Sequence, residues 1–137
     1  MKVVVDTNVF VAAGFNHHSH SARLLSGIQD GTLEMVWHET TKQETRRMLE
    51  RIPTLSWRTS ERLFAPESEV RDSLNLADYS FIRDVDDRKF AALAELADCT
   101  IVTNDNDLLS TRGRLTVPVL TPREFIRALQ DTTPDDA

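Results

Sequence analysis

The chain has 137 residues, a net charge of −6, and hydrophobic and charged contents of 40% and 28%. These values fit one globular domain, and they exclude a strongly basic nucleic-acid-binding chain; no apolar run approaches the length of a membrane span. A nucleic-acid partner would therefore be bound locally or through metal ions. We expect a cytoplasmic location, because Asp6 follows the start too early for a signal peptide.

Strand and helix patterns alternate through the first half of the chain. The apolar run over 2–6 predicts a strand covered on both faces, as in a parallel sheet. A helical pattern follows near 22–28, and 33–37 predicts a second strand. Helices are expected over 39–52, where a proline ends the helix, and over 56–65.

The alternation continues in the second half. A short third strand is expected over 79–82, and two more over 100–103 and 117–120, the last at a sheet edge because it contains a proline. Helices are expected over 87–97 and 122–129.

This order of elements predicts a three-layer α/β domain over 1–130, with a central, mainly parallel sheet of about five strands flanked by helices. The remaining residues, 131–137, are polar and acidic, and we expect them to be disordered. The single cysteine, Cys99, has no partner for an intramolecular disulfide and is expected in the core.

Two of the predicted strands end in an acid. Asp6 follows the first strand, and Asp105 follows the strand over 100–103. Parallel strands place their carboxyl ends at one sheet edge, where open α/β folds bind ligands, so we expect these carboxylates to lie side by side. The structural alternative is that Asp105 or Asp107 only caps the next helix.

A third acid, Glu44, lies on the predicted helix over 39–52. Glu44, Met48 and Ile52 follow one another at steps of four, which places Glu44 on or near the buried face. A buried carboxylate is costly unless it is paired or bound to metal. The alternative is a capping box formed by Thr41 and Glu44.

A fourth acid, Asp87, begins the predicted helix over 87–97, and Asp84 and Asp86 flank it. The helix dipole favours an acid at this position whatever its function. Three acids so close together nevertheless indicate a cation.

Carboxylates that converge on one cleft raise one another's pKa unless positive charge is supplied, and a divalent cation would supply it. The candidate ligands are all oxygens, which favours Mg²⁺ or Mn²⁺ over zinc. Because Mg²⁺ sites are usually completed by substrate phosphates, the implied chemistry is on a phosphate ester. The candidate ligands are Asp6, Asn8, Glu44, Asp87, Thr103, Asp105 and Asp107.

Three stretches of the chain and one single acid, taken in their order along the sequence, resemble the PIN-domain family. They are Val3-Val4-Val5-Asp6-Thr7-Asn8, Glu44, Asp87 ahead of Lys89-Phe90-Ala91-Ala92-Leu93-Ala94, and Ile101-Val102-Thr103-Asn104-Asp105-Asn106-Asp107-Leu108-Leu109. The stretch Arg83-Asp84-Val85-Asp86-Asp87 is similar to the subgroup of toxin components of toxin-antitoxin pairs. Arg88 departs from that subgroup, which often has another acid there.

The resemblance implies a metal-dependent ribonuclease that hydrolyses RNA phosphodiester bonds with Mg²⁺ or Mn²⁺ and has a cognate antitoxin protein as its partner. Whether the chain forms a homodimer stays open. Carried over by position, the catalytic and metal-binding set would be Asp6, Glu44, Asp87 and Asp105, with Asp107 as a fifth acid. The supporting residues would be Thr7, Asn8, Thr103, Asp84 and Asp86.

Basic residues lie on the opposite face of the helix over 39–52, namely Lys42, Arg46, Arg47 and Arg51. The default interpretation is a solvated helix face. The functional alternative is that Arg46, Arg47 and Arg51 contact RNA phosphates or a partner protein.

Two other functions compete with a nuclease. A phosphatase with an aspartate nucleophile would need a second acid two residues after Asp6, where this chain has Asn8. A PIN scaffold that only binds RNA or protein would have no need for four carboxylates at one sheet edge.

Overall fold

In the computed structural model, which describes residues 1–132, four parallel strands form one sheet in the order β2–β1–β3–β4. The strands are β1 (Lys2–Val5), β2 (Glu34–Met35), β3 (Thr100–Val102) and β4 (Val119–Leu120). The two central strands, β1 and β3, pair with Val5 opposite Val102. Their carboxyl ends, and the polar residues that follow, therefore meet at one edge of the sheet.

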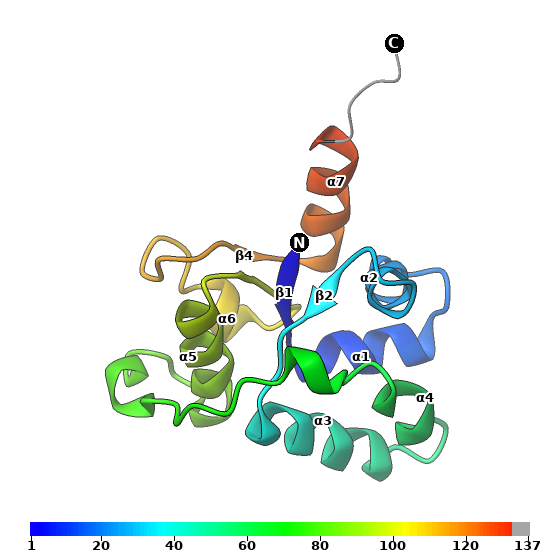
Figure 1. Cartoon of the computed structure of the whole chain (residues 1–137), viewed down its shortest axis with the longest axis horizontal. Helices are drawn as coiled ribbons and strands as arrows, with labels where there is room; N and C mark the ends of the chain where they lie inside the picture. Colours follow the sequence, from blue (N-terminus) through cyan, green and yellow to red (C-terminus); the bar gives the residue numbers. More distant parts are fainter. Residues whose placement is uncertain (133–137) are drawn as a thin grey trace.

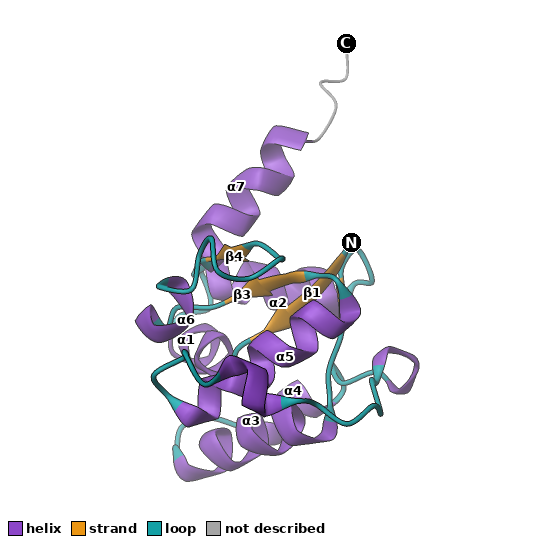
Figure 2. Cartoon of the chain, turned by 90° about the vertical axis from the view of Figure 1, so that its left-hand side faces the viewer, coloured by secondary structure: helices purple, strands orange, loops and turns teal. Residues whose placement is uncertain are grey.

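Helices cover both faces of this sheet, so the fold has three layers (Figures 1 and 2). The α-helices are α1 (Thr7–Phe15), α2 (His20–Gln29), α3 (Glu39–Arg51), α4 (Trp57–Glu61), α5 (Arg88–Ala97), α6 (Asn106–Leu109) and α7 (Pro122–Thr132). Three short 3₁₀ helices are η1 (Pro66–Ser68), η2 (Leu76–Tyr79) and η3 (Val85–Asp87). No helix in the described part of the chain is long and apolar enough to cross a membrane.

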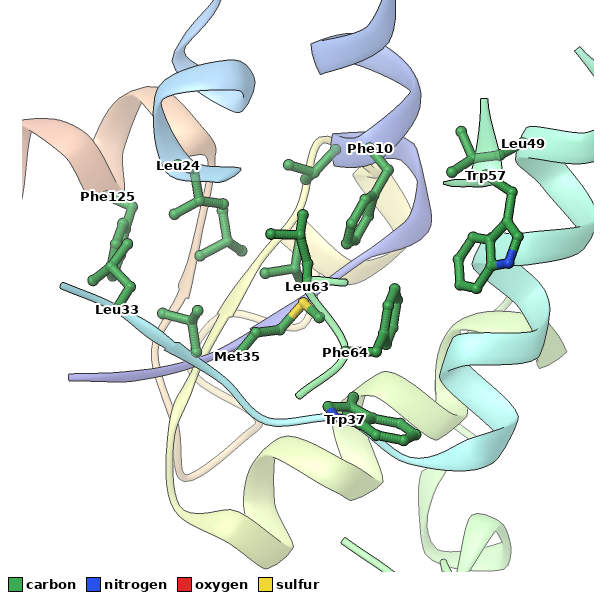
Figure 3. Packing of buried hydrophobic residues seen from close by; sticks show 14 residues of the cluster. Phe10, Leu24, Leu33, Met35, Trp37, Leu49, Trp57, Leu63, Phe64 and Phe125 are labelled. Carbon is green, nitrogen blue, oxygen red and sulfur yellow. The ribbon is translucent and has the colours of Figure 1, made fainter. Parts of the chain in front are cut away.

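The residues of β1 alternate between two hydrophobic clusters, one on each face of the sheet. Val3 and Val5 pack with Phe10 of α1 in the first cluster, shown in Figure 3. Val4 packs with Phe90 of α5 in the second. Burial on both faces explains why the strand is apolar at three successive positions. Cys99 is buried in the second cluster, as expected.

An aromatic group fixes the outer part of the first cluster (Figure 3). The ring of Phe64 stacks on Phe10 at 5.7 Å and contacts Trp37 edge-on at 5.6 Å and Trp57 at 5.4 Å. The Trp37 indole also donates a hydrogen bond of 2.7 Å to the carbonyl of Ala65. Through these contacts α4 and the following turn are tied to α1 and to the end of β2.

The sheet has four strands, where about five were expected. Residues 79–82 form no strand: Tyr79 ends η2, and its hydroxyl donates a 2.6 Å hydrogen bond to Glu95. Phe81 instead packs its ring under the guanidinium of Arg114, at 4.2 Å. The apolar residues of this segment are thus covered by side chains of α5 and the loop before β4, so no strand pairing is needed.

Other boundaries also differ from the expected ones. The helix expected over 56–65 is shorter, because α4 ends at Glu61, and α1 was not expected as a helix. The strand over 117–120 lies at the sheet edge, as its proline predicted. Of the tail expected to be disordered, 133–137 lie outside the described residues, while Asp131 and Thr132 belong to the end of α7.

Candidate active site

Asp6 lies at the carboxyl end of β1 and also caps α1. One carboxylate oxygen, Oδ1, accepts a 2.7 Å hydrogen bond from the amide of Thr7, which is the cap. The other oxygen, Oδ2, accepts a 2.7 Å hydrogen bond from the hydroxyl of Thr103 after β3. The side chain is 3% exposed and is therefore fixed on both oxygens.

Thr103 links this acid to Asp105. Its hydroxyl, which donates to Asp6, accepts a 2.9 Å hydrogen bond from the amide of Asp105. Asp105 in turn caps α6, because its Oδ1 accepts from the amide of Asp107 at 2.7 Å. Asp6 and Asp105 thus each cap a helix and also lie together at the edge of the sheet, so the helix-cap interpretation does not exclude a functional one.

Asp87 completes a group of three acids. One ligand atom from each of Asp6, Asp87 and Asp105 lies within 4.8 Å of the others. Asp87 is only 4% exposed, and its buried Oδ2 has no hydrogen-bond partner. A buried carboxylate oxygen without a partner is unfavourable in a protein alone. A cation placed among the three carboxylates would provide that partner.

A second group of three acids shares Asp87. It consists of Asp84, Asp87 and Asp107, again with ligand atoms within 4.8 Å of one another. Asp84 is exposed and accepts a 2.9 Å hydrogen bond from the amide of Asp86. Asp86 belongs to neither group but lines the same cleft.

The electrostatics of the site favour bound positive charge. Burial raises the pKa of Asp6 to about 6, and Asp105 and Glu44 add to the rise, against the hydrogen bonds from Thr103 and Thr7. Burial also raises the pKa of Asp87 to about 8, with further contributions from neighbouring acids, Asp6 first. Because the donors are oxygens, the site fits Mg²⁺ or Mn²⁺ better than zinc.

Glu44 does not cap α3, so the capping-box alternative is wrong. The cap is His38, and Thr41 is the third helical residue, where its hydroxyl pairs with the His38 amide. Glu44 points instead to neighbouring helices: Oε2 accepts a 3.0 Å hydrogen bond from Thr7, and Oε1 lies 2.5 Å from Lys89 Nζ. No pattern in the sequence singles out Lys89, apart from its place two residues after Asp87.

A cleft of about 490 Å³ is lined by six of these acids, namely Asp6, Glu44, Asp84, Asp86, Asp87 and Asp105, whereas Asp107 is not among its lining residues. One wall is α3, which presents Arg47, Met48 and Arg51 to the cleft. Arg46 is not part of that wall: its guanidinium pairs with Glu50 at 3.3 Å and lies over the ring of Trp57 at 5.9 Å. The three predicted contact arginines therefore divide into two that face the cleft and one that does not.

Two further residues support the site. Asn8 lines the cleft, and its side-chain oxygen accepts a 3.3 Å hydrogen bond from the amide of Asn104, next to Asp105. Arg88 is not among the residues that line the cleft: its guanidinium donates to the carbonyls of Ile82 at 3.0 Å and Ser80 at 3.2 Å. Arg88 therefore fixes the loop that leads to Asp87.

Comparisons with known proteins identify the fold and the family. The fold is similar to the crystal structure of FitAcB from Neisseria gonorrhoeae, with a TM-score of 0.56 and 18% identity, covering 88% of this chain and 98% of the other. No curated protein matches the sequence. The family model described as PIN domain matches residues 2–107, which is most of the chain. The chain therefore belongs to the PIN domain family.

Proposed function

We propose that the chain is a metal-dependent endoribonuclease that hydrolyses RNA phosphodiester bonds, and that it is the toxin of a toxin-antitoxin pair. The observation that supports this most is the convergence of Asp6, Asp87 and Asp105 within 4.8 Å, with a buried oxygen of Asp87 unpaired. Membership of the PIN domain family supports the same activity.

Each acid has its own task in this proposal. Asp6, Asp87 and Asp105 would hold Mg²⁺ or Mn²⁺, with Asp107 as a further acid close to Asp87 and with Glu44 on the wall of the cleft. Thr103 orients two of the acids through one hydroxyl, and Thr7 orients Asp6 through its amide and Glu44 through its hydroxyl. The bound ion would activate a water molecule and stabilise charge on the leaving oxygen.

The cleft also has features that suit a polyanion. Its floor is acidic, whereas Arg47 and Arg51 stand on the α3 wall one helical turn apart. We expect these two arginines to bind backbone phosphates on either side of the bond that is cut, while the ion neutralises the acids beneath. Arg46 pairs with Glu50 instead and has no such role.

An antitoxin would neutralise the enzyme by covering this cleft. The acidic floor favours a partner segment that inserts an arginine or lysine among the carboxylates, since a cationic side chain would take the place of the metal ion. Homodimer formation stays a prediction that gel filtration can test.

The test is cleavage of end-labelled single-stranded RNA by wild type, Asp6→Asn and Asp131→Asn, each in EDTA, Mg²⁺ and Mn²⁺. Asp131 is an exposed residue of α7 that does not line the cleft, so it is a matched control. We expect metal-dependent cleavage by wild type and Asp131→Asn, and none by Asp6→Asn. Hydrolysis of a phosphomonoester alone would indicate a phosphatase, and ion binding without hydrolysis would indicate an interaction module; either would refute the proposal.

A further inference from the structure

The ion pair between Lys89 of α5 and Glu44 of α3 lies beside the acidic cleft. Lys89 Nζ and Glu44 Oε1 are 2.5 Å apart, and the two side chains are only 13% and 17% exposed. A pair so well shielded from water is screened less than a surface pair, and removing one partner leaves the other charge uncompensated.

Glu44 is fixed on both of its oxygens. While Lys89 binds Oε1, the hydroxyl of Thr7 donates to Oε2 at 3.0 Å. That hydroxyl is itself 2.9 Å from the hydroxyl of Thr45, which is 1% exposed and therefore well fixed. Three helices, α1, α3 and α5, thus determine where the Glu44 carboxylate lies.

In this position Glu44 stands apart from the other acids. It lines the cleft, yet it belongs to neither of the two groups of three acids whose ligand atoms lie within 4.8 Å of one another in the described chain. Lys89, by contrast, is not one of the described residues that line the cleft. Lys89 therefore contacts a residue that lines the cleft without lining the cleft itself.

We propose that Lys89 is a positioning residue that holds Glu44 away from the cation bound by Asp6, Asp87 and Asp105. This rests on the proposed function. Without Lys89, Glu44 would have an uncompensated charge and no restraint on Oε1, so it would move toward the cation and become an additional ligand. With Lys89 in place, the cation would remain accessible to water and to an RNA phosphate, which Mg²⁺ and Mn²⁺ sites of nucleases require.

The test compares wild type, Lys89→Met and Lys89→Arg in two measurements. Calorimetric titration with Mn²⁺ alone should show that Lys89→Met binds about three- to tenfold more tightly, because a nearby positive charge is lost and a carboxylate is freed. For RNA cleavage by Lys89→Met at saturating Mn²⁺, we expect kcat to fall about 10- to 100-fold, as when a residue that orients groups around a metal is removed. KM should be nearly unchanged. Lys89→Arg keeps the charge and should restore both values toward wild type.

A residue that only maintains the fold would give a different pattern. Equal loss of Mn²⁺ affinity and turnover in Lys89→Met, or no change in either, would overturn the proposal. If Lys89→Met does not fold, Glu44→Gln decides: loss of Mn²⁺ affinity by more than about tenfold would mean that Glu44 is a direct ligand and that Lys89 does not hold it back. Loss of about threefold or less supports the restraint.

The two proposals can fail separately. Absence of RNA cleavage by wild type would count against the proposed function, whereas the Mn²⁺ titrations would still report on the restraint of Glu44. Metal-dependent cleavage by a wild type that Lys89→Met matches in Mn²⁺ affinity and kcat would refute only the role of Lys89.

Discussion

Asp6 and Thr103 are 97 residues apart in the sequence and are joined by a buried hydrogen bond of 2.7 Å between hydroxyl and carboxylate. The pairing of β1 with β3 makes this contact possible, because Val5 lies opposite Val102 and the next residue of each chain segment follows at the same sheet edge. The same hydroxyl accepts a hydrogen bond from the amide of Asp105, so one threonine sets the relative position of two acids.

Replacing this threonine should therefore lower both activity and stability. In Thr103→Val the carboxylate of Asp6 loses a donor and the Asp105 amide loses its acceptor, which should cost about 1–3 kcal/mol of unfolding free energy. We expect RNA cleavage to fall at least about tenfold because two ligands are no longer oriented. Denaturant unfolding and cleavage rates measure the two effects.

Thr111→Val is the matched control, because Thr111 is equally buried and its hydroxyl donates only to the carbonyl of Leu108. It should lose about 1 kcal/mol of stability and keep its activity. Equal activity in the two variants would show that Thr103 is only a structural residue.

The raised pKa values of Asp6 and Asp87 predict how the ion-free protein depends on pH. Both acids bind protons more tightly when folded than when unfolded, so protonation stabilises the fold. This contribution is complete below about pH 4. It is lost as pH rises through about 6 for Asp6 and about 8 for Asp87.

Divalent ions bind the deprotonated acids, so stabilisation by Mg²⁺ should grow over the same range. Melting temperatures with EDTA or Mg²⁺ between pH 5 and pH 8.5 test this; stabilisation that is equal at both ends would contradict it.

Asp87→Asn should remove the loss of stability that wild type shows when Asp87 deprotonates. The amide removes a carboxylate whose pKa is raised to about 8 by burial and by the neighbouring acids. In EDTA at pH 8.5 the variant should therefore unfold with a higher free energy than wild type, by the order of 1–3 kcal/mol, and the difference should shrink toward pH 5. It should also lose stabilisation by Mg²⁺. A variant less stable than wild type at pH 8.5 would mean that burial and the neighbouring acids do not destabilise the charged form of Asp87.

Replacing the arginines of α3 one at a time should affect RNA binding differently, because Arg47 and Arg51 line the cleft and Arg46 does not. Arg47→Ala and Arg51→Ala should each weaken binding of single-stranded RNA in EDTA, and each should lower the salt slope of log Kd by about 0.7. Arg46→Ala, on the same helix and with the same change of charge, should leave the slope nearly unchanged because Arg46 is paired with Glu50. Equal salt slopes of log Kd for all three variants would mean that these arginines form an ordinary solvated helix face and do not bind RNA phosphates.

The sequence predicted the parts of the fold that depend on local pattern and strand polarity. Val3, Val4 and Val5 form an apolar run that only a strand covered on both faces explains, and the acids that follow β1 and β3 meet as expected. The helix α1 was missed because Val9, Phe10 and Val11 lack helical amphipathicity; tertiary packing of Val9 and Phe10 compensates for this.

Contacts between distant segments could not be predicted in this way. The strand expected over 79–82 is absent because Glu95 and Arg114 cover its aromatic side chains, and no local pattern records those partners. For the same reason the spacing of Thr41 and Glu44 fits a capping box, whereas the partners of Glu44 in the structure are Thr7 and Lys89. The separation of Arg46 from Arg47 and Arg51 likewise depends on which neighbours each guanidinium meets.

Anomalous diffraction from crystals grown with Mn²⁺ can show whether the converging acids bind a divalent cation. We expect an anomalous peak among the carboxylates of Asp6, Asp87 and Asp105, within bonding distance of the Asp87 Oδ2 that has no hydrogen-bond partner. The same peak should be absent in crystals of Asp87→Asn. If the wild-type protein cleaves RNA with Mn²⁺ but shows no peak at these three acids, the cation is bound elsewhere and the proposed site is wrong.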